Sequence, residues 1–241
     1  MLMISDFHSH ILPGMDDGSR NVEESIALLE LEAAQGVRHV VLTPHFYPHN
    51  ESPHSFLRRR DKAEAVLRRA MEGRDDLPHL TIGAEVAYYL GMSQSEDLPL
   101  LTLRGTNFIL IEMPPAPWPK SVWRELRTIR EERGLNPIIA HLDRYIRPFR
   151  THGIPKRLEE EGIFVQVNAN FFLYRDTERM AMKMLKAGRI HVIGSDCHNL
   201  ETRRPNLQNA VEKIQQKLGR DVLYRISDYE RHMIPEIFRT E

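Results

Sequence analysis

Histidine and carboxylate side chains recur in this chain where apolar, strand-like segments end. The first two are His8 and His10, whose spacing places both imidazoles on one side of an extended strand. Such a pair can hold one metal ion, although a pair alone is weak evidence. The further candidates follow later apolar runs and are Asp17, His45, Glu85, Glu112, His141, Asp196 and His198. Together, these nine side chains point to a metal-dependent hydrolase.

Apolar runs rich in β-branched residues alternate with longer amphipathic runs, a pattern typical of repeated β/α units and a parallel sheet. Seven strands are expected, at residues 2–7, 37–43, 80–85, 107–112, 137–141, 163–168 and 190–195. Helices are expected at about residues 21–36, 53–71, 120–133, 155–161, 176–187 and 203–218. Asn21 is the expected N-cap of the first helix, and Gly36 its expected end.

The length of 241 residues suits one large α/β domain, and roughly 250 residues is usual for a β/α barrel. In such barrels, functional groups gather at the carboxyl ends of the strands. A single histidine is more often a surface or hydrogen-bonded core residue than a ligand. Most of the candidates stand at or just beyond expected strand ends, which favours one shared site; these are His8, His10, His45, Glu85, Glu112, His141 and Asp196, together with Asn168.

Charge and composition exclude several other classes of protein. The 33 Lys and Arg residues nearly balance 34 Asp and Glu residues, so nothing indicates a nucleic-acid or membrane partner. No basic leader followed by an apolar segment opens the chain, and no apolar run reaches about 18 residues. A cytoplasmic location is therefore expected. The single cysteine, Cys197, excludes an intramolecular disulfide.

Nine ligands are too many for one ion, because divalent metals of this kind take about four to six donors. Carboxylates that bridge two or three ions account for the number better. Imidazole and carboxylate donors without thiolate suit manganese, iron or zinc, of which manganese is favoured here. Three divalent ions would outweigh the four carboxylates, so the site would attract a phosphate dianion and lower the pKa of a bridging water.

Several motifs that carry these residues resemble a known superfamily. They are Asp6-Phe7-His8-Ser9-His10, Asp16-Asp17-Gly18, Thr43-Pro44-His45, Gly83-Ala84-Glu85, Ala140-His141-Leu142-Asp143-Arg144-Tyr145 and Ser195-Asp196-Cys197-His198-Asn199. The chain resembles the PHP (polymerase and histidinol phosphatase) superfamily, and within it the bacterial tyrosine-protein phosphatases associated with capsule and exopolysaccharide synthesis. The resemblance runs from about Leu2 to Pro205.

This resemblance implies a single domain over residues 1–241, built as a distorted seven-stranded, TIM-like β/α barrel with three metal ions, usually manganese. The implied ligand sets are His8, His10, Glu85 and Asp196 for one ion, Glu85, Glu112 and His141 for a second, and Asp17, His45 and His198 for a third. Arg144 and Arg203 match arginines that hold the phosphate, a role suited to a planar bidentate donor. His45 or Asp17 is the expected group that protonates the departing phenolate.

The implied function is hydrolysis of phosphotyrosine by a metal-bridging hydroxide. The expected partner is a phosphotyrosyl protein, namely a tyrosine autokinase of polysaccharide export, and a homo-oligomer is compatible with this. Aromatic residues that follow the strands could receive the tyrosine ring or pack loops against the barrel. These are Phe46, Tyr47, Tyr88, Tyr89, Trp118, Phe171, Phe172 and Tyr174.

The chain departs from the family pattern at two places. The usual His-Pro-Glu-Arg is His141-Leu142-Asp143-Arg144 here, which keeps both the carboxylate and the arginine. The usual Arg-Pro-Pro is Arg203-Arg204-Pro205, and spacing favours Arg203 as the arginine that faces the phosphate.

Four other interpretations remain open from sequence. A small-molecule phosphoesterase, such as a histidinol-phosphate phosphatase, would use the same metals. A non-catalytic, metal-dependent scaffold or regulator is a second alternative. An amidohydrolase would offer a bridging lysine where Glu85 and Glu112 stand. Finally, Cys197 and Arg203 match the Cys-x5-Arg pattern of thiolate phosphatases, which requires a depressed thiol pKa, but a thiol between two candidate metal ligands is better explained as a small buried residue.

Overall fold

The computed structural model describes residues 4–146 and 153–235, and all strand pairings between its named strands are parallel. The strands are β1 Ile4–Ser9, β2 Val37–Leu42, β3 His45–Phe46, β4 His79–Ile82, β5 Glu85–Ala87, β6 Phe108–Glu112, β7 Asn136–Ile139, β8 Phe164–Asn168 and β9 Val192–Gly194. The helices are α1 Val22–Ala34, α2 Pro53–Ala70, α3 Lys120–Glu131, α4 Asp143–Ile146, α5 Ile154–Glu160, α6 Asn170–Leu173, α7 Glu178–Lys186, α8 Leu207–Leu218 and α9 Asp221–Met233, with 3-10 turns η1 Met92–Gln94 and η2 Leu98–Leu101.

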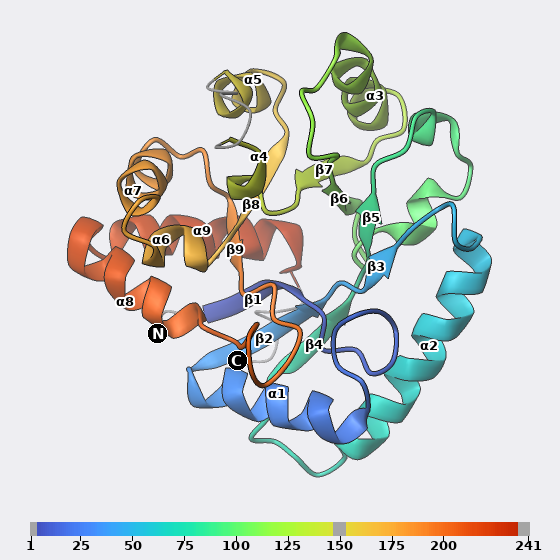
Figure 1. Ribbon diagram of the computed structural model, residues 1–241, viewed down its shortest axis with the longest axis vertical. Helices are drawn as coiled ribbons and strands as arrows, with labels where there is room; N and C mark the ends of the chain where they lie inside the picture. The colour runs from blue at the N-terminus through green and yellow to red at the C-terminus, as the bar shows by residue number, and fades with distance from the viewer. Residues whose placement is uncertain (1–3, 147–152, 236–241) are drawn as a thin grey trace.

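The strands form two curved parallel sheets. One has the order β1-β2-β4 and the other the order β3-β5-β6-β7-β8-β9. An isolated parallel bridge between Ser9 and Cys197 joins the end of β1 to the segment that follows β9. Figure 1 shows the strands gathered around the centre of the molecule and the long helices at its periphery. The expected α/β fold with parallel strands is therefore confirmed.

The expected number of seven strands is not confirmed, because one expected strand is divided in two and another is followed by a short additional strand. The strand expected over residues 80–85 is divided into β4 and β5 at Gly83 and Ala84. At Gly83, a Cβ atom would lie 2.5 Å from Cδ2 of Leu103, so the backbone approaches that side chain closely. After β2, Pro44 cannot donate a ladder hydrogen bond, and pairing resumes one residue later in β3.

Local signals explain most helix boundaries. Asn21 caps α1 as expected, since its Oδ1 accepts a hydrogen bond of 2.9 Å from the backbone N–H of Glu24. Gly36, with φ of 79°, follows the end of this helix. The helix expected from Arg203 begins only at Leu207, because the side chain of Asn199 accepts hydrogen bonds from three following backbone N–H groups and holds a loop there.

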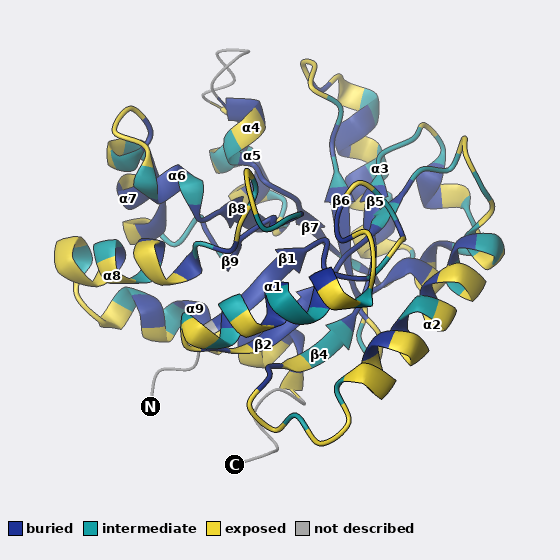
Figure 2. Ribbon diagram, turned by 60° about the horizontal axis from the view of Figure 1, so that its bottom comes forward, coloured by how far each residue is buried: buried dark blue, intermediate teal, exposed yellow. Residues whose placement is uncertain are grey.

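The core lies between the strands and the surrounding helices, as the dark strands of Figure 2 show. Helix α9 was not expected from the sequence. It buries Leu223, Ile226 and Met233, and Met233 packs with Val192 of β9 in one apolar cluster. Within residues 4–146 and 153–235, no helix combines the length and apolar character needed to cross a membrane.

Glu230 of α9 offers a test of this packing. It is only 3% exposed, and burial raises the pKa of its carboxyl to about 8, against 4.5 for a free glutamate. The folded protein therefore retains a proton that the unfolded chain releases, and stability present below pH 4.5 is lost as the pH rises towards 8. We expect Glu230→Gln to abolish this pH dependence. At pH 7, the free energy of unfolding of the variant should therefore exceed that of the wild type by on the order of 3 kcal/mol.

Urea unfolding of both proteins between pH 4 and pH 9 measures the difference. The two free energies of unfolding should agree near pH 4 and diverge as the pH rises. Asp228→Asn, at an exposed position of the same helix, serves as the control and should keep the pH dependence of the wild type. A parallel pH dependence for Glu230→Gln and the wild type would show that Glu230 is ionised in the folded protein.

Candidate metal centre

The two histidines of the first motif meet at the carboxyl end of β1. Their Nε2 atoms lie 3.1 Å apart. His8 Nδ1 lies 3.2 Å from Oε1 of Gln166, and His10 Nδ1 lies 2.7 Å from Oδ2 of Asp16. Because oxygen acceptors hold the Nδ1–H groups, the Nε2 lone pairs are directed into the space between the rings.

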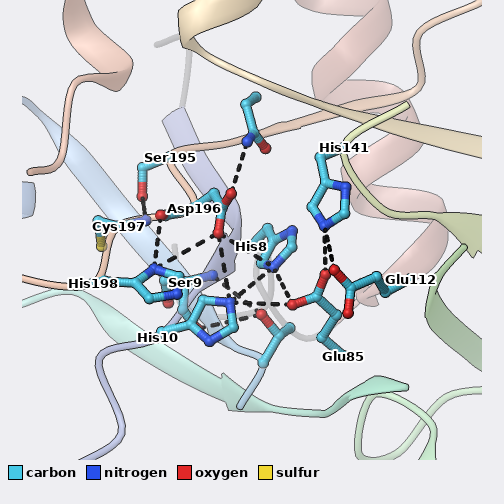
Figure 3. A network of polar contacts seen from close by, with 12 residues as sticks. His8, Ser9, His10, Glu85, Glu112, His141, Ser195, Asp196, Cys197 and His198 are labelled. Carbon is cyan, nitrogen blue, oxygen red and sulfur yellow. Dashed lines mark hydrogen bonds and ion pairs between the residues drawn. The ribbon is translucent and has the colours of Figure 1, made fainter. Parts of the chain in front are cut away.

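Glu85, at the start of β5, lies at the centre of the cluster and is fully buried. Its Oε2 lies 3.1 Å from His8 Nε2 and 3.2 Å from His10 Nε2. On its other side, Oε1 lies 2.6 Å from His141 Nε2. Burial opposes ionisation of this carboxyl, but the neighbouring imidazoles, His8 first among them, hold its pKa well below the usual range. Figure 3 shows Glu85 between His8 and His10 on one side and His141 on the other.

A second group of ligand atoms lies towards the solvent. Asp17 Oδ1 lies 3.4 Å from His198 Nε2 and 3.7 Å from His45 Nε2. The rings of His10 and His198 have centroids 3.9 Å apart. Asp17 is 67% exposed whereas His198 is 1% exposed, so this group extends from the buried floor to the mouth of the site.

Glu112, at the end of β6, forms the third part of the cluster. Its Oε1 lies 3.6 Å from His141 Nε2, and its Oε2 lies 3.8 Å from His45 Nδ1. Burial and the nearby charge of Glu85 raise the pKa of the Glu112 carboxyl. Two carboxylates this close need positive charge nearby to remain ionised together.

Asp196 lies opposite Glu85 and connects the cluster to two arginines. Its Oδ1 lies 3.5 Å from His10 Nε2 and accepts a hydrogen bond of 2.7 Å from Arg203. Its Oδ2 accepts hydrogen bonds from Arg144 and from the side chain of Asn168. Arg144, on α4, and Arg203, in the loop after β9, are thereby aimed at one carboxylate from two separate segments.

Two of these residues have unusual backbone conformations. In the described part of the chain, the non-glycine residues with positive φ are His141, at 30°, and Asp196, at 54°. Such angles cost free energy in residues with a Cβ atom, and they often occur at functional sites. Both strained residues belong to the nine side chains expected as ligands, which supports a functional role for the cluster.

The potential ligand atoms form three overlapping groups, and within each group all atoms lie within 4.8 Å of one another. They are His8, His10 and Glu85; His10, Asp17, His45 and His198; and His45, Glu85 and Glu112. The family resemblance assigns His10 and His45 to one ion each, whereas each of them belongs to two of these groups. The structure brings all nine expected side chains to one site, with His141 and Asp196 in contact with the three groups.

Buried polar atoms without hydrogen bonds indicate what this site can hold. Among the described residues, Glu85 Oε2, His45 Nδ1 and His198 Nε2 are buried and have no hydrogen-bond partner. Glu85 Oε2 and His45 Nδ1 are 3.0 Å apart, yet their geometry does not form a hydrogen bond. Donor atoms left unpaired around one space suit ligation of cations, and the mixed nitrogen and oxygen donors suit divalent transition metals.

Several supporting residues were not identified from the sequence. Gln166 of β8 accepts a hydrogen bond from the backbone N–H of His141 and lies beside His8. Asp16 binds His10 and also accepts a hydrogen bond of 2.8 Å from the backbone N–H of His45. The sequence signals for these two are a polar residue within an apolar strand, for Gln166, and the first aspartate of the Asp-Asp-Gly motif, for Asp16.

Tyr145 also supports the site, because its hydroxyl lies 3.1 Å from His141 Nδ1. Tyrosine, glutamine and aspartate side chains that hold ligand imidazoles in place are common around metal centres.

Cys197 does not face the cluster of ligands. It is fully buried, and its Sγ lies 3.8 Å from Oε1 of Glu32. Burial, together with the acidic neighbours Glu32 and Asp6, raises the pKa of this thiol well above its usual range. A thiolate nucleophile requires the opposite shift, so the structure argues against the Cys-x5-Arg interpretation.

A cavity of about 400 Å³ opens beside the two arginines. Its lining includes Arg144, Arg203, Asp196 and the exposed ring of Tyr174. A second cavity, of about 380 Å³, lies beside Asp17 and His45 and is lined partly by Tyr47. Of the other aromatic residues considered as walls, Phe46, Phe171, Phe172 and Trp118 are buried and pack in the core.

Known proteins were compared with the chain. It is 32% identical over 229 residues to the tyrosine-protein phosphatase CpsB of Streptococcus pneumoniae, with 89% of this chain and 90% of the relative covered. It is 28% identical over 230 residues to the tyrosine-protein phosphatase YwqE of Bacillus subtilis, with 92% and 88% covered.

A solved structure, described as one of the metal-dependent tyrosine phosphatases YwqE and CpsB from these two organisms, matches with a TM-score of 0.82 and 27% identity, over 95% of this chain and 93% of that chain. A model of the CpsB/CapC family of capsular polysaccharide synthesis matches residues 4–234. Because this match spans nearly the whole chain, the protein belongs to the CpsB/CapC family.

Proposed function

We propose that this protein is a metal-dependent protein-tyrosine phosphatase. The observation that carries the proposal is the convergence of eight imidazole and carboxylate side chains around the buried Glu85, with Arg144 and Arg203 directed at the same site. The tyrosine-protein phosphatases CpsB and YwqE, which this chain resembles over most of its length, support the choice of phosphotyrosine as substrate.

The proposed cofactors are three divalent ions, with manganese favoured and iron or zinc as alternatives. The three overlapping groups of donor atoms support this number. When bound, such ions lower the pKa of water towards neutrality and offset the charge of a phosphate. The proposed ligands are His8, His10, Asp17, His45, Glu85, Glu112, His141, Asp196 and His198.

The chain's own residues bind and orient the substrate. Arg144 and Arg203 reach the cavity from two sides of Asp196, so their guanidinium groups can share the non-bridging oxygens of one phosphate. The exposed ring of Tyr174 lines the same cavity and offers an apolar wall for the tyrosine ring. His45 or Asp17 would protonate the leaving phenolate, which needs little help because its conjugate acid has a pKa near 10.

Further proposals concern the fold, the partner protein and the location of the protein. The nine strand segments are proposed to form a distorted seven-stranded, TIM-like barrel, in which β2 continues into β3 and β4 continues into β5. Residues 1–241 are proposed to form one domain. The proposed partner is a tyrosine autokinase of polysaccharide export. A cytoplasmic location, the absence of nucleic-acid and membrane partners, and a possible homo-oligomer stay predictions.

A small-molecule phosphoesterase is the main alternative, since histidinol phosphate presents the same phosphate dianion. A non-catalytic scaffold is less favoured, because all nine expected ligand positions are present and in contact. An amidohydrolase is also less favoured, because Glu85 and Glu112 occupy the positions where a bridging lysine would be needed.

Metal removal tests the proposal directly. We expect chelation to lower kcat/KM for a phosphotyrosyl peptide by more than roughly 100-fold, because the arginines alone cannot supply the nucleophile. Adding back manganese should restore it. Histidinol phosphate, assayed in parallel, should be hydrolysed with a much lower kcat/KM. Full activity in protein shown by elemental analysis to be free of metal would contradict the proposal, and a preference for histidinol phosphate would favour the alternative.

The arginines can be tested one at a time. Lysine keeps the charge but loses the planar, bidentate donor geometry, so we expect Arg144→Lys and Arg203→Lys each to lower kcat/KM roughly 10- to 100-fold. Inorganic phosphate should also inhibit both variants less strongly. Arg220→Lys, at an exposed position outside the lining of the cavity, is the control. Kinetics of both variants equal to those of the control would remove the arginines from the phosphate site.

A further inference from the structure

Arg204 stands next to Arg203 in the chain and lines the same cavity of about 400 Å³. Arg203 is bound to Asp196. Arg204, in contrast, is exposed and forms neither an ion pair nor a side-chain hydrogen bond with any residue in 4–146 or 153–235. Arg204 therefore lies in the cavity proposed to receive the phosphate and is free to bind a second anion.

The backbone that carries Arg204 is held firmly. Before it, the Asn199 side chain accepts hydrogen bonds from the backbone N–H groups of Glu201, Thr202 and Arg203. After it, the carbonyl oxygen of Pro205 accepts a hydrogen bond of 2.9 Å from Gln35 on the C-terminal side of α1. The backbone position of Arg204 relative to Arg203 is therefore set before any ligand binds, so only the arginine side chain has to be ordered by a contact.

The size of the cavity exceeds what a phosphate group needs, since pockets of roughly 300–1,000 Å³ accommodate drug-sized ligands. Its remaining lining is mostly polar and includes Asn170 and Asn206, whose side chains are hydrogen-bonded to each other at 2.6 Å. Among the lining arginines, Arg144 and Arg203 are bound to Asp196, and the carboxylate of Glu201 lines the cavity as well. The second anion of a ligand would thus find Arg204 as the unpaired cation.

We propose that Arg204 is a specificity-determining residue, which binds the carboxylate of an acidic residue adjacent to the phosphotyrosine of the substrate. This inference rests on the proposed function. Arg203 and Arg204 line the same cavity, so a phosphate bound by Arg203 and a carboxylate close to it in the substrate can be contacted together.

The test compares three phosphotyrosyl peptides that differ only in the residues flanking the phosphotyrosine, which are Glu, Gln or Lys. We expect the metal-loaded wild type to hydrolyse the Glu peptide with a kcat/KM about fivefold above that for the Gln peptide, an effect the size of an exposed ion pair, mainly through KM. Arg204→Ala should reduce this ratio to about one. Arg204→Glu should invert the order, so that the Lys peptide becomes the best substrate of the three.

Arg220→Ala is the matched control, because it removes an exposed arginine outside the lining of the cavity and should keep the wild-type ratio. Circular dichroism verifies that each variant is folded. Equal turnover of the three peptides by the wild type, or an unchanged ratio in folded Arg204→Ala and Arg204→Glu, would overturn the role of Arg204 and leave the phosphatase function standing. Failure of the wild type to hydrolyse all three peptides would overturn the proposed function together with this inference.

Discussion

Glu85 carries its carboxylate where water does not reach it, within 3.2 Å of nitrogen atoms on four imidazoles. An ionised carboxylate is costly to bury unless positive charge compensates it. The imidazoles come from β1 and the residue that follows it, from β3 and from the segment after β7, so this one carboxylate connects parts of the chain that are far apart in sequence. Cations shared by the same ligands would supply the compensating charge and would attract phosphate for the same reason.

The fold accommodates this centre at a local cost. A Cβ atom on Gly194 of β9 would lie 2.5 Å from Cβ of His8, so a glycine is needed where the last strand meets the first. Asp196 follows two residues later with a positive φ, which turns its carboxylate towards the ligands. The interruptions between β2 and β3 and between β4 and β5 occur just before His45 and Glu85. Irregular backbone is thus concentrated where ligands enter the site.

Much of the site could be predicted from sequence, because parallel strands place their carboxyl ends at one edge and ligand residue types recur there. The supporting groups could not. Gln166 lies within a strand, and its role depends on the strands on either side of it, which no local pattern specifies. Adjacent aspartates likewise look equivalent in sequence, although Asp16 binds His10 and Asp17 lies at the exposed mouth. Helix α9 could not be predicted because its position depends on tertiary contacts with β9 and α8, which no local pattern specifies.

The most direct test of the account is the number of divalent ions bound per chain by wild type and by Glu85→Gln, measured by elemental analysis after equilibration with manganese and dialysis. Glu85 belongs to two of the three groups of ligand atoms. The account predicts about three ions for the wild type and at most one for the folded variant, since an amide cannot replace a bridging carboxylate. An equal number of ions in both proteins, or no stoichiometric metal in the wild type, would contradict it.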